Sequence, residues 1–293
     1  MTGPTTYIRI AARAVLLGTA LFLFSCNAAS NRSGISSTPE PAAPPKPVHI
    51  HPSFDLTLSG LKELTADTRP DIHARIMARP QYFLELMKKE LTGSQDLFWL
   101  VDKSHALPAD YRPADLAALS DYEDRLTLNR ADLVLRAVVM PDLLAMVEAA
   151  RQDGVVLPLS STFRSYQYQD ALFSRYVREE GEAKAERESA RPGHSQHQLG
   201  TTIDFGSVTA AFAQSAAGRW LEANAGHFGF SMSYPPGMEE VTGYIYESWH
   251  FRYVGRVATT LQQEFFDNVQ QYALAFYQSH HAQLAEHLLP AGG

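Results

Sequence analysis

Three short stretches of the chain gather polar side chains that could do chemistry together. They are residues 161–169, 191–204 and 247–250. His197, Asp204 and His250 offer two imidazoles and a carboxylate, a donor set that suits Zn²⁺, and a hydrolytic zinc site uses three protein ligands plus a water. From residue types and spacing alone, two interpretations stay open: a zinc site, or a polar core in which histidines and acids satisfy one another.

The local pattern indicates how these groups could meet. Gly200 lets the chain turn between His197 and Asp204, and Asp204 then falls on a short apolar strand. An unpaired carboxylate is costly there unless a cation neutralises it. Glu247 precedes His250 by three residues, so the two would face opposite sides of a straight strand. We therefore expect Glu247 on the turn before the strand, where a general base would lie beside a metal-activated water.

Helices and short strands must position these motifs. Apolar periodicity predicts helices over residues 54–92, 121–150 with a restart at Pro141, 165–180, 209–225 and 256–289. Residues 155–164, 201–205 and 244–254 are predicted as strands, and residues 181–194 as a loop. Helices come first and short strands carry the polar residues, which predicts an α+β fold.

Composition excludes several classes of protein. The chain has 293 residues, of which 45% are hydrophobic and 19% charged, so it can bury a sizeable core. A net charge of -7 argues against a nucleic-acid partner, because no basic excess exists to displace counterions from phosphates. A single cysteine excludes a disulfide framework, a zinc ribbon and an iron–sulfur cluster.

The N-terminal residues predict export and lipid attachment. Residues 1–25 are typical of a signal peptide, since two arginines precede the apolar run 14–24, which is too short to span a bilayer. Cys26 directly follows Leu23-Phe24-Ser25, a sequence that resembles the lipobox of bacterial lipoproteins. This resemblance implies that the Cys26 thiol is diacylated and becomes the mature N-terminus.

A proline-rich linker is predicted after the lipid attachment site. Residues 26–53 combine Cys26 with a composition that favours extended polyproline II, and His49 and His51 are expected to be solvated within it. The acidic chain should contact the membrane only through its acyl chains. We expect a lipid-anchored periplasmic protein of the cell envelope, and Asn27 after Cys26 favours the outer membrane.

Together, the three polar motifs resemble the VanY-type zinc D-alanyl-D-alanine carboxypeptidases. These belong to a wider group with lysostaphin-like endopeptidases and the sonic hedgehog fold. The matching residues are Phe163-Arg164-Ser165-Tyr166-x-x-Gln169, Ser195-x-His197 through Asp204, and Glu247-x-Trp249-His250-x-Arg252-Tyr253-Val254-Gly255. The resemblance covers residues 95–256, which leaves residues 54–94 as a helical lead-in and residues 257–293 as a helical extension.

The resemblance implies a fold and a role for each motif residue. It implies a small antiparallel sheet that carries the zinc site and is packed with helices, with extra helices at both ends. His197, Asp204 and His250 would hold Zn²⁺. Glu247 would be the base and later the proton donor, and Arg164 would stabilise the oxyanion. The residues that would line the substrate pocket are Gln169, Ser195, Tyr234 and Trp249.

Three positions depart from the family pattern without removing a ligand or the base. Phe163 stands where Tyr is usual, Gln196 where Glu is common, and Ser248 where Pro is common. These departures would affect the shape of the pocket. Outside the motifs, His194 is expected to be solvated or to lie behind the ligands, and His280, His281 and His287 are expected on a solvated helix face.

The expected function is removal of the terminal D-alanine from peptidoglycan stem peptides. Alternatives are a peptidoglycan endopeptidase, an L,D-carboxypeptidase and a non-catalytic wall-binding lipoprotein. Ser59 and Lys62 form a Ser-x-x-Lys motif typical of penicillin-binding proteins, but the companion Ser-Asp-Asn and Lys-Thr-Gly motifs are missing.

Overall fold

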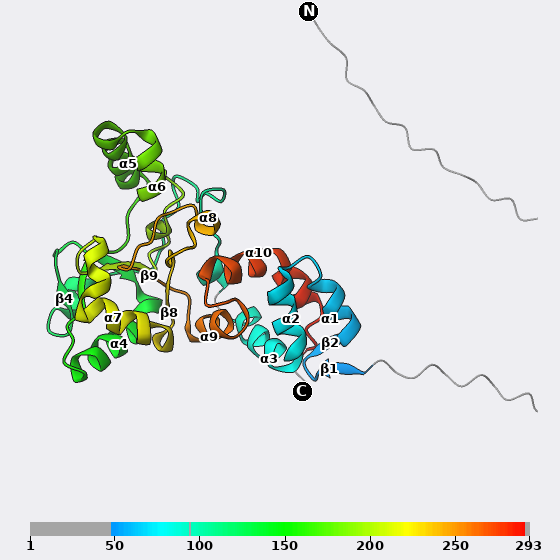
Figure 1. Cartoon of the computed structure of the whole chain (residues 1–293). Coiled ribbons are helices and arrows are strands. Elements are labelled where there is room, and N and C mark those ends of the chain that lie inside the picture. Colours follow the sequence, from blue (N-terminus) through cyan, green and yellow to red (C-terminus); the bar gives the residue numbers. More distant parts are fainter. Residues whose placement is uncertain (1–47, 94, 291–293) are drawn as a thin grey trace, which may run out of the picture. The chain divides into compact units, whose positions relative to one another are not determined.

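A five-stranded sheet carries the polar motifs. The structure is a computed structural model that describes residues 48–93 and 95–290 (Figure 1). The strands run in the order β4, β6, β7, β9 and β8. Their bounds are Thr127–Leu128 for β4, Pro158–Ser161 for β6, Thr202–Phe205 for β7, His250–Tyr253 for β9 and Phe230–Met232 for β8.

The predicted α+β fold is confirmed, and the predicted antiparallel sheet needs one correction. β4 and β6 pair in parallel, whereas the other neighbours are antiparallel. The reason is a crossover, since the chain leaves β4 and passes through helix α4 (Met140–Gln152) before it enters β6. Two small two-stranded antiparallel sheets lie outside this sheet: β1 (His49–His51) with β2 (Phe54–Thr57), and β3 (Leu116–Ala118) with β5 (Val134–Arg136).

The remaining helices lie before, between and after the strands. Helices between the strands are α5 (Tyr166–Glu180), α6 (Glu182–Glu188), α7 (Ala216–Asn224) and α8 (Glu239–Thr242). Short 3₁₀ helices are η1 (Gln95–Phe98), η2 (Leu119–Tyr122), η3 (Ala137–Val139), η4 (Gln196–Leu199), η5 (Ala210–Gln214) and η6 (Ala225–Phe228). The terminal helices are α1 (Leu58–Leu64), α2 (Pro70–Ala78), α3 (Pro80–Leu91), α9 (Arg256–Phe265) and α10 (Gln270–Glu286).

The terminal helices share one hydrophobic core with the sheet. The ring of Phe83 in α3 lies 5.2 Å from that of Phe265 in α9 and 5.6 Å from that of Phe276 in α10, both edge to face. All three are buried, and burial of one such side chain contributes about 1.5–3 kcal/mol. The predicted lead-in and extension therefore pack on each other and on residues 95–256 (Figure 1).

Local sequence explains where several helices begin. Ser165 caps α5, as its hydroxyl accepts a hydrogen bond from the Tyr168 amide, and α5 matches the predicted helix 165–180. The predicted helix 209–225 divides at Ser215, whose hydroxyl accepts from the Gly218 amide and starts α7. Helix α4 begins at Met140 with Pro141 in its first turn, as predicted for the restart.

Three predicted elements are wrong in part. Residues 123–136 are not helical and contain β4 and β5, because the extended backbone of these strands pairs with β6 and β3. The predicted loop 181–194 contains α6, which consists of good helix formers and is supported by ion pairs of Lys184 with Glu180 and Glu188. The predicted strand 244–254 is a strand only over β9, and turns precede it.

The predicted linker and two histidines also need correction. β1 lies inside the predicted linker and pairs with β2, which replaces the start of the predicted helix 54–92, so the fold begins by His49. His51 is buried against Phe54, with its Nε2 3.2 Å from Glu85 Oε2. His280 is buried and its Nε2 lies 2.8 Å from Asp67 Oδ1, so it is not on a solvated face.

The predicted signal peptide and Cys26 lie outside the described residues. Within residues 48–93 and 95–290, every helix falls short of the length and apolarity that a membrane crossing requires.

Glu90 in α3 predicts an unusual dependence of stability on pH. Its side chain is buried, and burial raises its pKa to about 8. Because the pKa is raised in the folded state, the stabilisation is fully present below about pH 4.5 and is lost as pH rises toward 8. We expect Glu90→Gln to raise the free energy of unfolding at pH 8.5 by roughly 2–4 kcal/mol and to change it little at pH 4.5.

Urea denaturation across this pH range measures the effect. Glu63→Gln, at an exposed position of α1, is the matched control and should follow the wild type. Parallel pH profiles for Glu90→Gln and the wild type would contradict the prediction.

Candidate active site

The register between β7 and β9 brings the first two polar side chains together. Asp204 pairs directly with His250, so their side chains leave the same face of the sheet. His197 lies in η4, just before β7. Gly200 ends η4 with a φ of 69°, and a Cβ there would lie 3.0 Å from side chains of Arg136 and Leu116. This left-handed turn directs His197 back toward Asp204.

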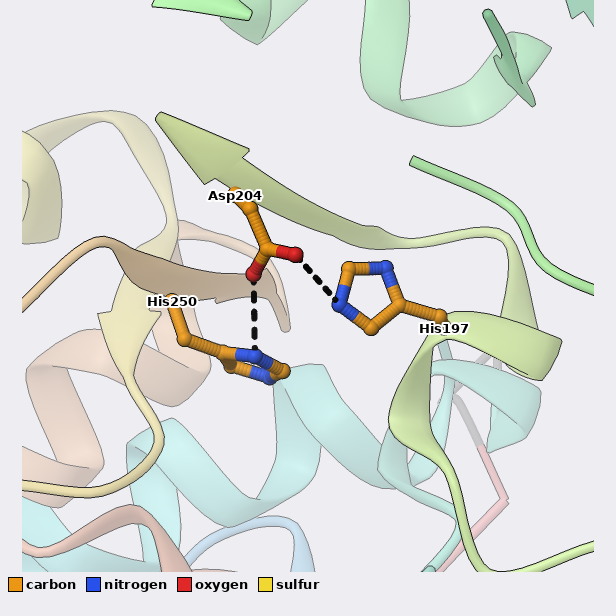
Figure 2. Close-up of side chains that lie close together, drawn as sticks. All are labelled: His197, Asp204 and His250. Atoms are coloured by element: carbon orange, nitrogen blue, oxygen red, sulfur yellow. Dashed lines mark ion pairs between the residues drawn. The ribbon is translucent and has the colours of Figure 1, made fainter. Parts of the chain in front are cut away.

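Asp204 lies between the two imidazoles (Figure 2). Its Oδ2 is 3.2 Å from His197 Nε2, and its Oδ1 is 3.2 Å from His250 Nδ1. One ligand atom from each residue lies within 4.8 Å of those of the other two, and all three side chains are buried. The structure thus gathers into one cluster the three residues for which the sequence suggested zinc binding.

The cluster fits a metal ion because two of its facing atoms lack a hydrogen-bond partner. His197 Nε2 and Asp204 Oδ1 are buried without a hydrogen-bond partner, although each faces another member of the cluster. His197 Nδ1 donates to the Thr162 carbonyl at 2.6 Å, which leaves Nε2 with its lone pair. Two imidazoles and a carboxylate that converge in this way suit Zn²⁺.

The electrostatics of the cluster keep Asp204 ionised and His197 neutral, the states that a metal needs, whereas His250 must lose a proton when it binds a metal ion. Burial acts to raise the pKa of Asp204, but His197 and Arg164 hold it well below its usual range. Burial, with help from Arg164, lowers the pKa of His197 to about 4, so the imidazole is neutral. Burial acts to lower the pKa of His250, but contacts with Asp204 and Glu247 raise it to about 8.

Glu247 lies on the turn before β9, and His250 is the first residue of that strand, as predicted. Its Oε2 lies 3.3 Å from His250 Nδ1, and its amide donates to the Tyr234 carbonyl at 3.1 Å. Burial raises the pKa of Glu247, an effect that the hydrogen bond with His250 opposes. A carboxylate thus adjoins the cluster without belonging to it.

Arg164 follows β6 and reaches the same cluster. Its Nη2 donates to Asp204 Oδ2, and its Nε donates to the Ser161 hydroxyl at 2.9 Å. The side chain also borders the cavity in front of the cluster. The sequence suggested a role only at the oxyanion, and the structure adds an ion pair with a candidate metal ligand.

A cavity of about 470 Å³ opens onto the cluster. Its volume is within the range of small-molecule sites. The four residues suggested for substrate binding all border it: Gln169, Ser195, Tyr234 and Trp249. The Tyr234 ring lies 4.7 Å from the His250 ring. The Gln169 Nε2 donates a hydrogen bond to the Ala190 carbonyl at 2.7 Å, so Gln169 also fixes the position of the chain after α6.

Sequence reasoning missed several residues of this cavity and its surroundings. Tyr244 borders the cavity, its ring is 4.8 Å from that of Tyr234, and Lys103 Nζ lies 3.7 Å from its ring centre. Tyr168 borders the opening of the cavity and is half exposed. Gln196 Oε1 lies 3.3 Å from His250 Nε2. Only Gln196 gave a signal in the sequence, as a departure from the family motif.

Two other residues that drew attention lie away from the cluster. His194 Nδ1 donates to the Asp102 carbonyl at 2.7 Å, and His194 does not belong to the metal-ligating group. Ser59 is exposed on α1, its hydroxyl faces Glu63, and it does not border the cavity. The serine peptidase alternative therefore has no support in the site.

Comparisons of sequence identify relatives of the chain. A statistical model of the VanY D-alanyl-D-alanine carboxypeptidase family matches residues 132–256. The Bacillus subtilis strain 168 protein YodJ is 33% identical over 215 residues, which cover 69% of this chain and 78% of YodJ. A D-alanyl-D-alanine carboxypeptidase of Enterococcus faecalis strain V583 is 35% identical over 170 residues, which cover 55% of this chain and 59% of that enzyme.

Solved structures agree with these relatives. The LD-carboxypeptidase LdcB is similar with a TM-score of 0.55 and 32% identity, covering 61% of this chain and 85% of LdcB. VanYB in complex with D-alanine-D-alanine has a TM-score of 0.52 and 30% identity, and the match covers 63% of this chain and 98% of VanYB. A mutant of VanY from a VanB-type cassette, in complex with Zn(II), has a TM-score of 0.51 and 29% identity, and the match covers 61% of this chain and 99% of that mutant. The family match, the extent of the alignment with YodJ and the shared fold lead to one conclusion: the chain belongs to the VanY D-alanyl-D-alanine carboxypeptidase family.

Proposed function

We propose that the protein is a zinc-dependent D,D-carboxypeptidase that removes the terminal D-alanine from peptidoglycan stem peptides. The observation that carries the proposal is the convergence of His197, Asp204 and His250, with Glu247 beside them, at the wall of one cavity. A non-catalytic wall-binding protein would need the cavity but would not need a buried carboxylate next to the metal ligands.

The three buried ligands would hold the zinc ion through His197 Nε2, His250 Nδ1 and a carboxylate oxygen of Asp204. Zinc bound there supplies a Lewis acid that lowers the pKa of water and polarises the scissile carbonyl. The side chains themselves fix the position of the ion, since Thr162 orients His197 and Arg164 orients Asp204.

Glu247 provides proton transfer. Its carboxylate accepts a proton from the attacking water and then delivers it to the amine of the departing D-alanine. Burial raises its pKa, which makes the protonated form accessible for the second step. Nearby, the fixed charge of Arg164 stabilises the oxyanion that develops during attack, and loss of one such group typically costs about 3–4 kcal/mol.

The scissile bond has one alternative that a specific observation favours. VanYB is bound to D-alanine-D-alanine in its solved structure, which supports cleavage between two D-residues. LdcB is described as an LD-carboxypeptidase and is equally similar, which supports cleavage of a tetrapeptide. Endopeptidase activity would require a longer peptide to continue past the cavity.

For localisation, we propose a lipid-anchored protein in the periplasm, placed at the outer membrane. Support comes from the sequence alone: an apolar run at residues 14–24, the lipobox-like residues before Cys26, and the proline-rich segment that follows. Such an anchor would hold the enzyme within reach of its polymeric substrate.

Zinc binding should stabilise the fold through the three ligands. At zinc concentrations of about 100 Kd, the expected gain is about 2.7 kcal/mol, which raises the Tm by roughly 5–10 °C for a domain of this size. His197→Ala should abolish this rise. His194→Ala is the control and should keep the rise in Tm, because His194 lies three residues away in the sequence and its ring is hydrogen-bonded to the Asp102 carbonyl. Thermal melts with and without Zn²⁺ measure the effect, and a wild type that does not respond to zinc would contradict the assignment.

Substitution of Glu247 should separate zinc binding from catalysis. Glu247→Gln should keep the zinc-dependent rise in Tm but reduce D-alanine release from pentapeptide muropeptides at least about 100-fold, because proton transfer is lost. Glu240→Gln, exposed on α8, is the control and should be fully active. Near-normal turnover by Glu247→Gln would refute the role of the base.

The same assay distinguishes the alternatives. A chelator should stop release and penicillin should not, whereas the opposite pattern would indicate a serine peptidase. Release of D-alanine from tetrapeptides but not pentapeptides would establish the L,D activity instead.

Lipid attachment is testable because Cys26 is the only cysteine of the chain. We expect the wild type to incorporate a labelled fatty acid in a bacterial host and to fractionate with membranes. Cys26→Ser should lose the label and appear in the soluble periplasmic fraction. Equal labelling of both proteins would exclude Cys26 as the attachment site.

A further inference from the structure

A chain of buried amide side chains connects His250 with the C-terminal extension. Gln196 lies beside the His250 ring, Ser233 and Gln270 lie behind Gln196, and all three are buried. Gln270 is the first residue of α10, which follows the stretch matched by the family model. The extension therefore reaches to within one residue of a candidate metal ligand.

A backbone carbonyl fixes the direction of this chain. The Nε2 of Gln270 donates to the Ser231 carbonyl at 3.3 Å, so its Oε1 must face the other way. That Oε1 accepts a hydrogen bond from Gln196 Nε2 at 3.2 Å. Gln196 consequently turns its own Oε1 toward His250 Nε2, at 3.3 Å. Each amide has one donor end and one acceptor end, and so the first orientation determines the second.

The orientation of Gln196 has a consequence for the His250 ring. Its Oε1 also accepts from the Ser233 hydroxyl at 2.7 Å, and it has no proton to offer. His250 Nε2 can make this contact only by donating the ring proton, which places the lone pair on Nδ1 when that nitrogen binds a metal ion. Nδ1 is the nitrogen that faces Asp204 Oδ1 at 3.2 Å.

The position of Gln270 is itself well defined by α9 and α10. The Ser231 hydroxyl donates to Gln262 of α9 at 2.7 Å, and Gln262 in turn donates to the Asn268 carbonyl at 2.9 Å. Phe276 of α10 packs on Phe83 in the core. The packing of α10 on the core thus holds the Gln270 amide against Ser231 in β8, at the edge of the five-stranded sheet.

We propose that Gln270 is a positioning residue for the metal site, which sets the ring tautomer and orientation of His250 through Gln196. The inference rests on the proposed zinc site and extends it to a residue outside the stretch matched by the family model. It gives the C-terminal extension a role in ligand preorganisation, beyond its contribution to the hydrophobic core. Partners of this kind typically change metal affinity by about 10–100-fold.

Two measurements on purified protein test the proposal. Zinc affinity is measured by competition with a chromophoric chelator, and the protonation of the His250 ring nitrogens is read by ¹⁵N NMR of the metal-free protein at a pH above 9, where the ring is neutral. We expect Gln196→Ala to weaken zinc binding about 10-fold or more and Gln270→Ala about 3–10-fold. Both variants should shift His250 toward the tautomer with a proton on Nδ1.

The matched control is Gln278→Ala, the same substitution at an exposed position of α10. It should leave both readouts unchanged. The double variant Gln196→Ala with Gln270→Ala should bind zinc as weakly as Gln196→Ala alone, because Gln270 acts through Gln196. An additive loss would mean that Gln270 acts by another route and would overturn the proposal.

A conservative variant separates positioning from folding. Gln270→Glu keeps an acceptor for Gln196 Nε2 but loses the donor to the Ser231 carbonyl and buries a charge. We expect a lower Tm with the wild-type tautomer and zinc affinity within about 2-fold of normal. If Gln270→Ala and Gln278→Ala give the same affinity and the same tautomer, the proposal is wrong. A wild type that binds no zinc refutes the proposed function, whereas the tautomer still reports on Gln270 in that case.

Discussion

The pairing of β7 with β9 is the constraint on which the rest of the site depends. Asp204 lies directly opposite His250, and a shift of one residue would turn one of the two side chains to the other face of the sheet. His197 can complete the cluster only because Gly200 adopts a left-handed conformation between η4 and β7. Arg164 and Glu247 then approach from the segments next to these strands, one after β6 and the other before β9. The catalytic arrangement is thus a property of strand register and two turns.

Burial makes this arrangement demanding. Asp204, His197 and His250 are nearly inaccessible to water, and His197 Nε2 and Asp204 Oδ1 lack a hydrogen-bond partner. Such groups destabilise a fold unless something else satisfies them. The protein satisfies the outward atoms with the Thr162 carbonyl, the Arg164 guanidinium and the Gln196 amide, and it leaves the inward atoms for a cation. Structural order and metal affinity therefore come from the same contacts.

The terminal helices show how segments outside the family motif contribute to the site. α3, α9 and α10 share an aromatic cluster of Phe83, Phe265 and Phe276, which joins the two ends of the described chain. Fully buried Arg252 donates to the carbonyls of Leu97 and Trp99, and so it ties β9 to the segment that follows the lead-in. Neither contact is local in sequence, and each holds an element that borders the strands of the site.

The sequence by itself determined the chemistry and the local signals. The types and order of His197, Asp204, Glu247 and His250, the turn at Gly200 and the helix over residues 165–180 were all predictable, because each depends on a short stretch of chain. Tertiary structure decided what depends on distant partners. Residues 127–128 and 134–136 became strands because β6 and β3 lie beside them. His51 and His280 became buried in contact with Glu85 and Asp67, which lie far away in the sequence. The contact of Gln270 with Gln196 spans 74 positions, and only packing of α10 against the sheet could create it.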